Sequence, residues 1–331
     1  MGTTSELLLE LHKRGREVGV AEFQEWALAK VKERLPFDAA LWAVGAITET
    51  GPIIHGMHLH RRPPEMLADY MPIWREDKLL AALLASPGKS ISMSQLGFQS
   101  PQAQEYLRKW DIGHVVSTLV EDPHTRLFYA ISLYRSQRAA AYSEEERSLK
   151  QDVMPHLIET WRTNRMAHLM KMREMGASVN STAALVDRQG LLHLSDDLFA
   201  ALLHNEWPQW RGPYVPDALL PYLHHATEQQ PTDCECGSTL AYVGETLVAK
   251  FDPCQDQVII RLRAKRSYDR LAPRERQVAR LFGSGQSQKQ VAKALSLAPS
   301  TINNYLATIY NKLAIKDKAQ LATMVAKFEE A

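Results

Sequence analysis

The stretch SLAPSTINNYLATIYNKL, residues 296–313, constrains the fold of this chain more than any other segment. Ile302, Leu306, Ile309 and Leu313 recur at the spacing of one face of an α-helix, so these side chains must face a core. The stretch contains no acidic residue, although the 331-residue chain has 38 Asp and Glu. The face opposite the apolar one carries short amides and hydroxyls. The stretch therefore predicts a helix with one buried face and one acid-free polar face.

The residues around this stretch predict three more short helices. Pro273 suits the first position of a helix and Gly283 suits its end. Ser287 and Gln290 have the spacing of a capping box, which predicts that the segment QKQVAKAL is helical. A last helix is expected over about 318–328, with apolar residues on one stripe. The acid-free helix is thus the third of four.

As a whole, residues 271–328 resemble a LuxR-type (GerE-type) helix-turn-helix domain. The resemblance implies that helix 299–313 is a recognition helix, which enters the major groove of double-stranded DNA. Short amides and hydroxyls can pair with base edges there, while lysines contact phosphates. We expect base contacts from Ser300, Thr301, Asn303, Asn304, Ala307 and Thr308, and phosphate contacts from Lys289, Lys293, Lys312 and Lys316.

In that family the last helix supports dimerisation, and two copies would contact two half-sites. The resemblance therefore implies that the apolar stripe of the last helix contacts a second copy of the chain. The expected dimer contacts are Leu321, Met324, Val325 and Phe328. For Leu321, packing beneath the recognition helix is an equal alternative.

The charge of the chain is divided unevenly between its two ends. Residues 261–331 contain 14 Lys and Arg against 5 Asp and Glu, whereas residues 1–260 contain 25 against 33. The overall formal charge of +1 hides this asymmetry. A basic end on an otherwise acidic chain is typical of proteins that bind a polyanion through that end. A solvated basic tail is the alternative.

Upstream of residue 261, short apolar strands alternate with helical segments. The order of strands and helices up to a long helix that begins after Ser143 resembles a GAF-type sensory domain. The segment 181–265 resembles a PAS-type unit. We therefore expect α/β (α+β) sensory domains, GAF-like then PAS-like, followed by a small all-α four-helix domain. The predicted domains are 1–175, 178–265 and 268–331.

Aromatic residues of the first domain could line a mostly apolar pocket for a small-molecule effector. The segment YMPIWRED resembles the Trp, Tyr and Asp cluster of acyl-homoserine-lactone receptors. Here, however, the tyrosine precedes the tryptophan, and Lys78 stands where those receptors usually have proline, so that group is disfavoured. The predicted ligand-binding residues are Trp42, Tyr70, Trp74, Asp77 and Trp110.

The segment HGMHLHRR suggests a metal site, but its residues are predicted to form a strand. His58 and His60 would share one face and His55 would point to the other, so a three-ligand site is not expected. Cys234 and Cys236, with the distant Cys254, lack a zinc spacing. No sequence motif of a catalytic site is present, so neither an enzymatic activity nor a cofactor is predicted.

These observations predict a ligand-responsive transcription regulator that binds DNA as a homodimer, with RNA polymerase as a further partner. No apolar run approaches the roughly 20 residues of a membrane span, and we expect a cytoplasmic protein. A phosphorelay response regulator is disfavoured, because no phosphoacceptor Asp is evident after an N-terminal strand. An adaptor that uses its helical domain for protein contacts alone stays as an alternative.

Overall fold

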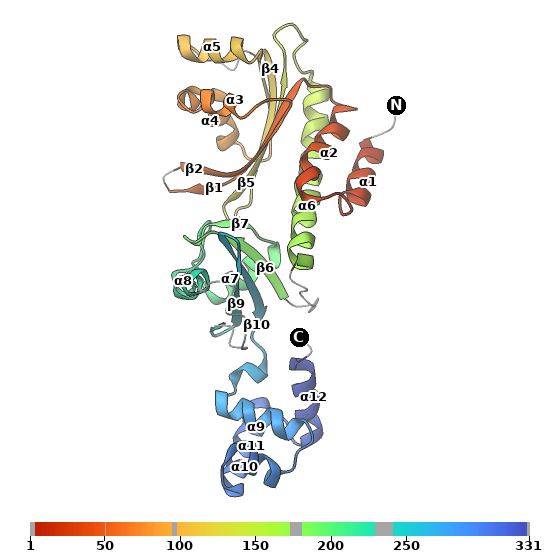
Figure 1. Cartoon of the computed structure of the whole chain (residues 1–331). Coiled ribbons are helices and arrows are strands. Elements are labelled where there is room, and N and C mark those ends of the chain that lie inside the picture. Colours follow the sequence, from red (N-terminus) through yellow and green to blue (C-terminus); the bar gives the residue numbers. More distant parts are fainter. Residues whose placement is uncertain (1–3, 50, 95–97, 173–180, 229–240, 330–331) are drawn as a thin grey trace.

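Three packed units follow one another along the chain in the computed structural model (Figure 1). The structure describes residues 4–49, 51–94, 98–172, 181–228 and 241–329. We call the units N-terminal (α1 to α6), central (β6 to β10) and C-terminal (η5 to α12). The first two are built on antiparallel sheets and the third is entirely helical. This is the predicted fold class. In the described part of the chain, no helix combines the length and apolar character needed to cross a bilayer.

The N-terminal unit is a five-stranded sheet with helices on both faces (Figure 1). Along β1, Trp42 and Val44 face α2 and α6, whereas Leu41 and Ala43 face the opposite side, where α3 to α5 pack. This alternation follows from the two-residue period of a strand. The elements are α1 (Thr4–Arg14), α2 (Val20–Lys32), β1 (Ala39–Thr48), β2 (Gly51–His60), α3 (Glu65–Tyr70), η1 (Trp74–Glu76), α4 (Lys78–Ala85), β3 (Ser90–Ser94), α5 (Pro101–Lys109), β4 (His114–Glu121), β5 (Leu127–Arg135) and α6 (Glu144–Met172).

The long helix α6 begins where the sequence predicts. Ser143 and Glu146 form the capping box: the Ser143 amide donates to the Glu146 carboxylate over 2.9 Å, and the Glu146 amide donates to the Ser143 hydroxyl over 3.2 Å. Pro155 lies inside the helix. Gly176, a residue type suited to the end of a helix, lies outside the described residues.

The central unit repeats the strand arrangement of the first. Its sheet has the order β7-β6-β10-β9-β8, and the N-terminal sheet has the order β2-β1-β5-β4-β3, so both place the fifth strand of the unit beside the first. Helix α7 is capped by Asp196, whose carboxylate accepts from the Phe199 amide over 2.8 Å, and not by the preceding Ser195. The elements are β6 (Ser181–Val186), β7 (Leu192–Leu194), α7 (Asp197–Glu206), η3 (Asp217–Leu219), α8 (Leu220–Glu228), β8 (Ala241–Val243), β9 (Leu247–Cys254) and β10 (Gln257–Ala264).

Apolar side chains from both units meet where the N-terminal unit rests on the central one. Ala46 and Leu127, at the ends of their strands, belong to the core of the central unit. Close by, the ring of His55 on β2 lies against that of His193 on β7, with their centroids 4.1 Å apart. The two units are therefore packed together and not merely tethered.

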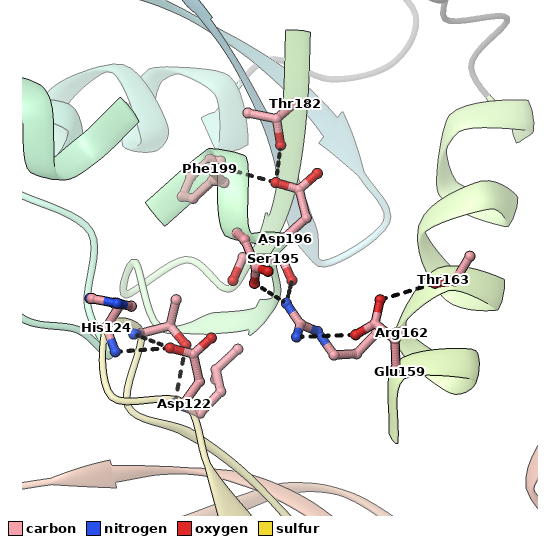
Figure 2. Close-up of polar contacts among 12 residues, drawn as sticks. Asp122, His124, Glu159, Arg162, Thr163, Thr182, Ser195, Asp196 and Phe199 are labelled. Carbon is pink, nitrogen blue, oxygen red and sulfur yellow. Dashed lines mark hydrogen bonds and ion pairs between the residues drawn. The ribbon is translucent and has the colours of Figure 1, made fainter. Parts of the chain in front are cut away.

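Polar contacts reinforce this junction (Figure 2). Arg162 of α6 donates to the Ser195 carbonyl over 3.2 Å and to the Asp197 carboxylate over 3.1 Å, at the start of α7. At the same junction, the Gly212 amide donates to the His124 carbonyl over 3.1 Å. These contacts link residues far apart in the sequence, and no sequence motif predicts them.

The C-terminal unit packs four α-helices and a short 3-10 helix around one apolar core. The ridge predicted from the sequence forms part of that core: Ile302, Leu306, Ile309 and Leu313 are each at most 4% exposed. The Ser287–Gln290 capping box is also confirmed. The elements are η5 (Ser267–Arg270), α9 (Pro273–Gly283), α10 (Gln288–Leu295), α11 (Pro299–Leu313) and α12 (Lys318–Glu329).

Candidate nucleic-acid interface and ligand cavity

The outer face of α11 is polar, uncharged over most of its length, and open to solvent. Ser300, Asn303, Asn304, Ala307 and Thr308 are exposed, and Thr301 is half-buried. The Thr308 hydroxyl donates to the Asn304 carbonyl over 3.0 Å, which fixes the side chain against its own helix. Both asparagine side chains are free of hydrogen bonds to other described residues. This arrangement presents donors, acceptors and small apolar groups together, which is what base edges in a major groove require.

A short turn joins α10 to α11 and sets the angle between the two helices. Ser296, which ends α10, adopts a left-handed backbone conformation with φ of 54°. The guanidinium of Arg274 on α9 donates to the Leu295 carbonyl at that same helix end, over 3.0 Å. A side chain from the first helix thus stabilises the turn that sets the direction of α11.

One of the four predicted phosphate contacts has a partner within the fold. The Lys312 ammonium donates to both oxygens of Glu275 over 2.8 Å. Glu275 is buried and also accepts from the Ala272 amide over 2.7 Å. Burial opposes ionisation of Glu275, but the hydrogen bonds from Lys312 and the Ala272 amide outweigh it and lower the pKa of the carboxyl. Lys312 therefore holds α11 to α9.

The other three predicted phosphate contacts are exposed. Lys289 and Lys293 lie on α10, and Lys316 lies just before α12. Exposed lysines without a strong internal partner can reach phosphate oxygens at little cost. They lie on the segments that precede and follow α11 in the chain.

Two of the four predicted dimer contacts of α12 are buried within their own unit and so are not available to a second copy. Leu321 is fully buried and Val325 is 4% exposed, both in the core of their own unit. Val325 packs on α9 so closely that a Cβ added to Gly283 would lie 2.9 Å from its Cγ2. Met324 is partly buried against the same core, and the Phe328 side chain lies outside the described part of the chain. Sequence periodicity identified the apolar stripe but could not tell which surface covers it.

A cavity of about 410 Å³ lies between the N-terminal sheet and helices α3 to α5. Three of the five predicted ligand-binding residues, Tyr70, Trp74 and Asp77, line it. Trp42 does not, because it lies on the opposite face of β1, fully buried against the rings of Phe23 and Trp161.

Trp110 does not line the cavity either. It follows α5, and its indole nitrogen donates to Asp69 over 3.0 Å, away from the cavity lining. Asp69 also binds the Lys109 ammonium over 2.6 Å. Trp110 therefore ties α5 to α3. The small residues Ala43 and Ala130, which the sequence analysis did not single out, line the cavity instead.

The polar end of the cavity is built around Asp77. One carboxylate oxygen caps α4, accepting from the Leu79 amide over 2.8 Å and from the Leu80 amide over 3.0 Å. The other accepts from the Tyr70 hydroxyl over 2.6 Å. Burial and the neighbouring Asp77 carboxylate raise the pKa of Tyr70, so its hydroxyl stays protonated and donates. Among the described residues of the lining, Asp77 is the one that carries a charge, and the others are mostly aliphatic and aromatic.

Two of the three histidines of β2 share a partner, and the third does not. His58 and His60 both bind the Glu25 carboxylate, over 2.9 and 2.8 Å. His55, beside a β-bulge in the pairing of β1 with β2, packs on His193 instead. Among the described residues, no three His, Cys, Asp or Glu side chains are arranged to hold a metal ion. Cys234 and Cys236 lie outside those residues.

Comparison with known protein families gives a match to the C-terminal part of the chain. Residues 269–325 match the model for bacterial regulatory proteins of the luxR family. Over 67 residues the chain is 37% identical to the HTH-type transcriptional regulator Rv0890c of Mycobacterium tuberculosis, covering 20% of this chain and 8% of that protein. Over 55 residues it is 29% identical to the HTH-type regulator YhjB of Escherichia coli, covering 17% of this chain and 28% of that protein. The chain thus spans less than a third of these relatives.

Solved structures give weaker similarities. CepR2, an N-acylhomoserine-lactone-dependent LuxR-family factor from Burkholderia cenocepacia, aligns with 51% of this chain and 99% of its own at 13% identity and a TM-score of 0.38. SdiA of Escherichia coli aligns with 98% of this chain and 95% of its own, at 12% identity and a TM-score of 0.36. A phycoerythrobilin-bound GAF domain from a cyanobacterial phytochrome aligns with 51% of this chain and 99% of its own, at 12% identity and a TM-score of 0.36. Similarities this low support no inference about the ligand of this chain.

Proposed function

The C-terminal unit is a LuxR-type helix-turn-helix domain, and we propose that the chain is a transcription regulator that binds double-stranded DNA through it. The observation that carries the proposal is the exposed, acid-free face of α11, held outward by four buried aliphatic side chains. Ser300, Thr301, Asn303 and Asn304, in the N-terminal half of the helix, are the proposed base contacts. Lys289, Lys293 and Lys316 are the proposed phosphate contacts.

We further propose that the cavity of the N-terminal unit binds a small-molecule effector. A volume of about 410 Å³ lies within the range of ligand pockets in proteins. Asp77, the one charged residue in the described part of the lining, would repel an anion. The geometry favours a mostly apolar, uncharged molecule that donates a hydrogen bond to the Asp77 carboxylate or to the Tyr70 hydroxyl oxygen.

The remaining features of the proposal rest on the helix-turn-helix assignment. Regulators of this type read two half-sites as dimers, so we propose a homodimer that works with RNA polymerase in the cytoplasm. The domain limits 1–175, 178–265 and 268–331 stay a prediction. Since Leu321 and Val325 are buried within their own unit, the dimer interface lies elsewhere than on those two residues.

The DNA-binding proposal is tested by replacing one base-contact residue. Duplexes are first selected from fragments of the host genome with the full-length protein. Asn304→Ala should weaken binding to the selected duplex by about 1 to 3 kcal/mol, because a paired base edge loses its partner. Fluorescence anisotropy measures both affinities, and Asn205→Ala, the same change at an exposed position of α7, is the control.

The salt dependence of binding separates the proposal from an adaptor. Binding should weaken steeply as salt rises, and Lys289→Ala should reduce the slope by about one counterion. A protein that uses the helical domain for protein contacts alone shows no salt-dependent affinity for duplex DNA. That result, or equal affinities for wild type and Asn304→Ala, contradicts the proposal.

The ligand proposal is tested by native mass spectrometry of protein purified from its own host. We expect a bound small molecule, because a large apolar cavity favours occupancy. Ala43→Phe places a ring inside the cavity and should abolish the mass adduct while the circular dichroism spectrum is unchanged. An adduct retained by Ala43→Phe would place the ligand elsewhere.

A further inference from the structure

An ion pair spans the connection between the central and C-terminal units. Arg263, near the end of β10, donates to the two carboxylate oxygens of Asp269 in η5 over 2.6 and 2.7 Å. Asp269 is 6% exposed and also accepts from the Arg266 amide over 2.7 Å. Burial opposes ionisation of Asp269, but the hydrogen bonds from Arg263 and from the Arg266 amide outweigh it and lower its pKa. A two-point contact of this kind fixes direction as well as distance.

The chain on either side of this pair is anchored to a different unit. The Lys265 amide donates to the Thr246 carbonyl over 2.6 Å, which holds the connection to the central unit. Tyr268 is buried in the core of the C-terminal unit, and η5 packs against both α11 and α12. Arg266 and Ser267 alone separate the two anchors. Two residues are too few to act as a flexible linker.

We propose that Arg263 and Asp269 are a positioning pair that sets the orientation of the C-terminal unit on the central unit. Neither side chain is assigned a contact with DNA. The pair acts through η5, which touches α11, so the direction of the β10 strand is passed to the recognition helix. Breaking the contact leaves a buried carboxylate without its cation, which favours a rearranged connection.

A second ion pair on the same strand supplies a matched control. Arg261 lies two residues before Arg263 and donates to both oxygens of Asp252 over 2.6 and 2.7 Å. Asp252 lies on the neighbouring strand β9, opposite Ile259 and diagonal to Arg261, so this pair stays inside the central sheet. Both arginines make a two-point contact with a carboxylate, Arg263 through its two terminal nitrogens and Arg261 through Nε and one terminal nitrogen. The Arg263 contact crosses between units, and the Arg261 contact does not.

The orientation itself is measured without DNA, by electron-electron double resonance on the full chain. The three cysteines are changed to serine, and spin labels are placed at Ala218→Cys in the central unit and Ala319→Cys in the C-terminal unit, both exposed positions. We expect one narrow distance distribution for the parent protein and for Arg261→Gln. Arg263→Gln should give a distribution at least about twice as broad, because the two-point contact is lost.

A third variant keeps the test decisive if Arg263→Gln loosens the C-terminal fold. Arg263→Lys retains the charge but cannot make the two-point contact, so it should give intermediate broadening with an unchanged melting temperature. A narrow distribution in both Arg263 variants overturns the proposal. Equal broadening in Arg261→Gln also overturns it, because the effect would then come from the sheet in general.

The consequence for DNA rests on the proposed function and is tested separately. Selection from random duplexes carrying two half-sites at varied separation should give one preferred spacing for the parent protein. Arg263→Gln should reduce that preference about tenfold or more, while affinity for a single half-site is unchanged because α11 is intact. A spacing preference kept by Arg263→Gln contradicts the positioning role. If the parent protein binds no duplex, the proposed function fails, and the distance measurement still decides the inference.

Discussion

The N-terminal and central units share a strand order but differ in what fills the space over the sheet. In the N-terminal unit, helices α3 to α5 leave a cavity of about 410 Å³ above β1, β4 and β5. In the central unit, Phe199 of α7 is fully buried over the sheet, together with Trp210 and Leu223. Small residues on the strands do not explain the difference, because Ala43 and Ala249 are buried in the two sheets alike. The strand order therefore does not determine whether a unit contains a cavity. The side chains of the helices that cover the sheet determine it.

The largest change in stability is expected when one phenylalanine in each unit is truncated to alanine, and the two changes test this comparison. Phe199→Ala should destabilise the central unit by about 3 to 5 kcal/mol, because it opens a new cavity in a packed core. Phe128→Ala should cost the N-terminal unit about 1 to 2 kcal/mol less, since Phe128 already borders the cavity and loses fewer contacts. Hydrogen exchange read by mass spectrometry reports each unit separately. Equal costs would mean that the cavity is filled in solution.

A pH titration tests how firmly the two units are joined. Burial, with His193 and Arg165 nearby, lowers the pKa of His55 to about 4, while Asp187 acts in the opposite direction. The folded state then binds fewer protons than the unfolded state, so stability is full above pH 6.5 and falls as the pH drops towards 4. The loss amounts to about 3 kcal/mol at most.

The comparison variant for this titration is His55→Gln, which cannot take up the proton. Its denaturant midpoint should fall less steeply than that of the wild type between pH 6.5 and pH 4. Parallel profiles for the two proteins would show that His55 is accessible to protons in the folded state, and hence that the junction opens readily.

A buried lysine gives the smallest of the expected effects. Lys150 of α6 is 4% exposed and donates to Thr118, with burial holding its pKa well below the usual value. The buried polar residues of the central unit, Thr182 and Ser195, carry no charge. Lys150→Met should stabilise the N-terminal unit by about 1 to 3 kcal/mol at neutral pH, because the apolar side chain needs no desolvation.

The sign of the pH dependence checks this account of Lys150. With the folded pKa lowered, wild-type stability should rise as the pH rises from neutral towards 10.5, and Lys150→Met should lack that rise. Lys89→Met, at an exposed position, is the control in urea unfolding. A destabilised Lys150→Met would mean that the hydrogen bond to Thr118 outweighs the burial of the amine.

Local patterns predicted the C-terminal unit best. The ridge from Ile302 to Leu313 and the capping box at Ser287 depend on residues within four positions of each other along the chain, and the structure has them as predicted. The cavity was predicted less completely. Tyr70 and Asp77 are close in sequence and were identified, whereas Trp42 was placed on the wrong face of its strand and Ala43 was missed.

The sequence by itself determined the helices of the C-terminal unit, their caps, the acid-free face of α11 and the alternation of strands and helices before it. These follow from short-range sterics and hydrogen bonding. Tertiary structure alone decided that Val325 faces its own core, that Lys312 binds Glu275, and that a cavity opens in one sheet-based unit where side chains fill the other. Each of these depends on which surfaces meet across distant parts of the chain, and periodicity within one element carries no information about its partner.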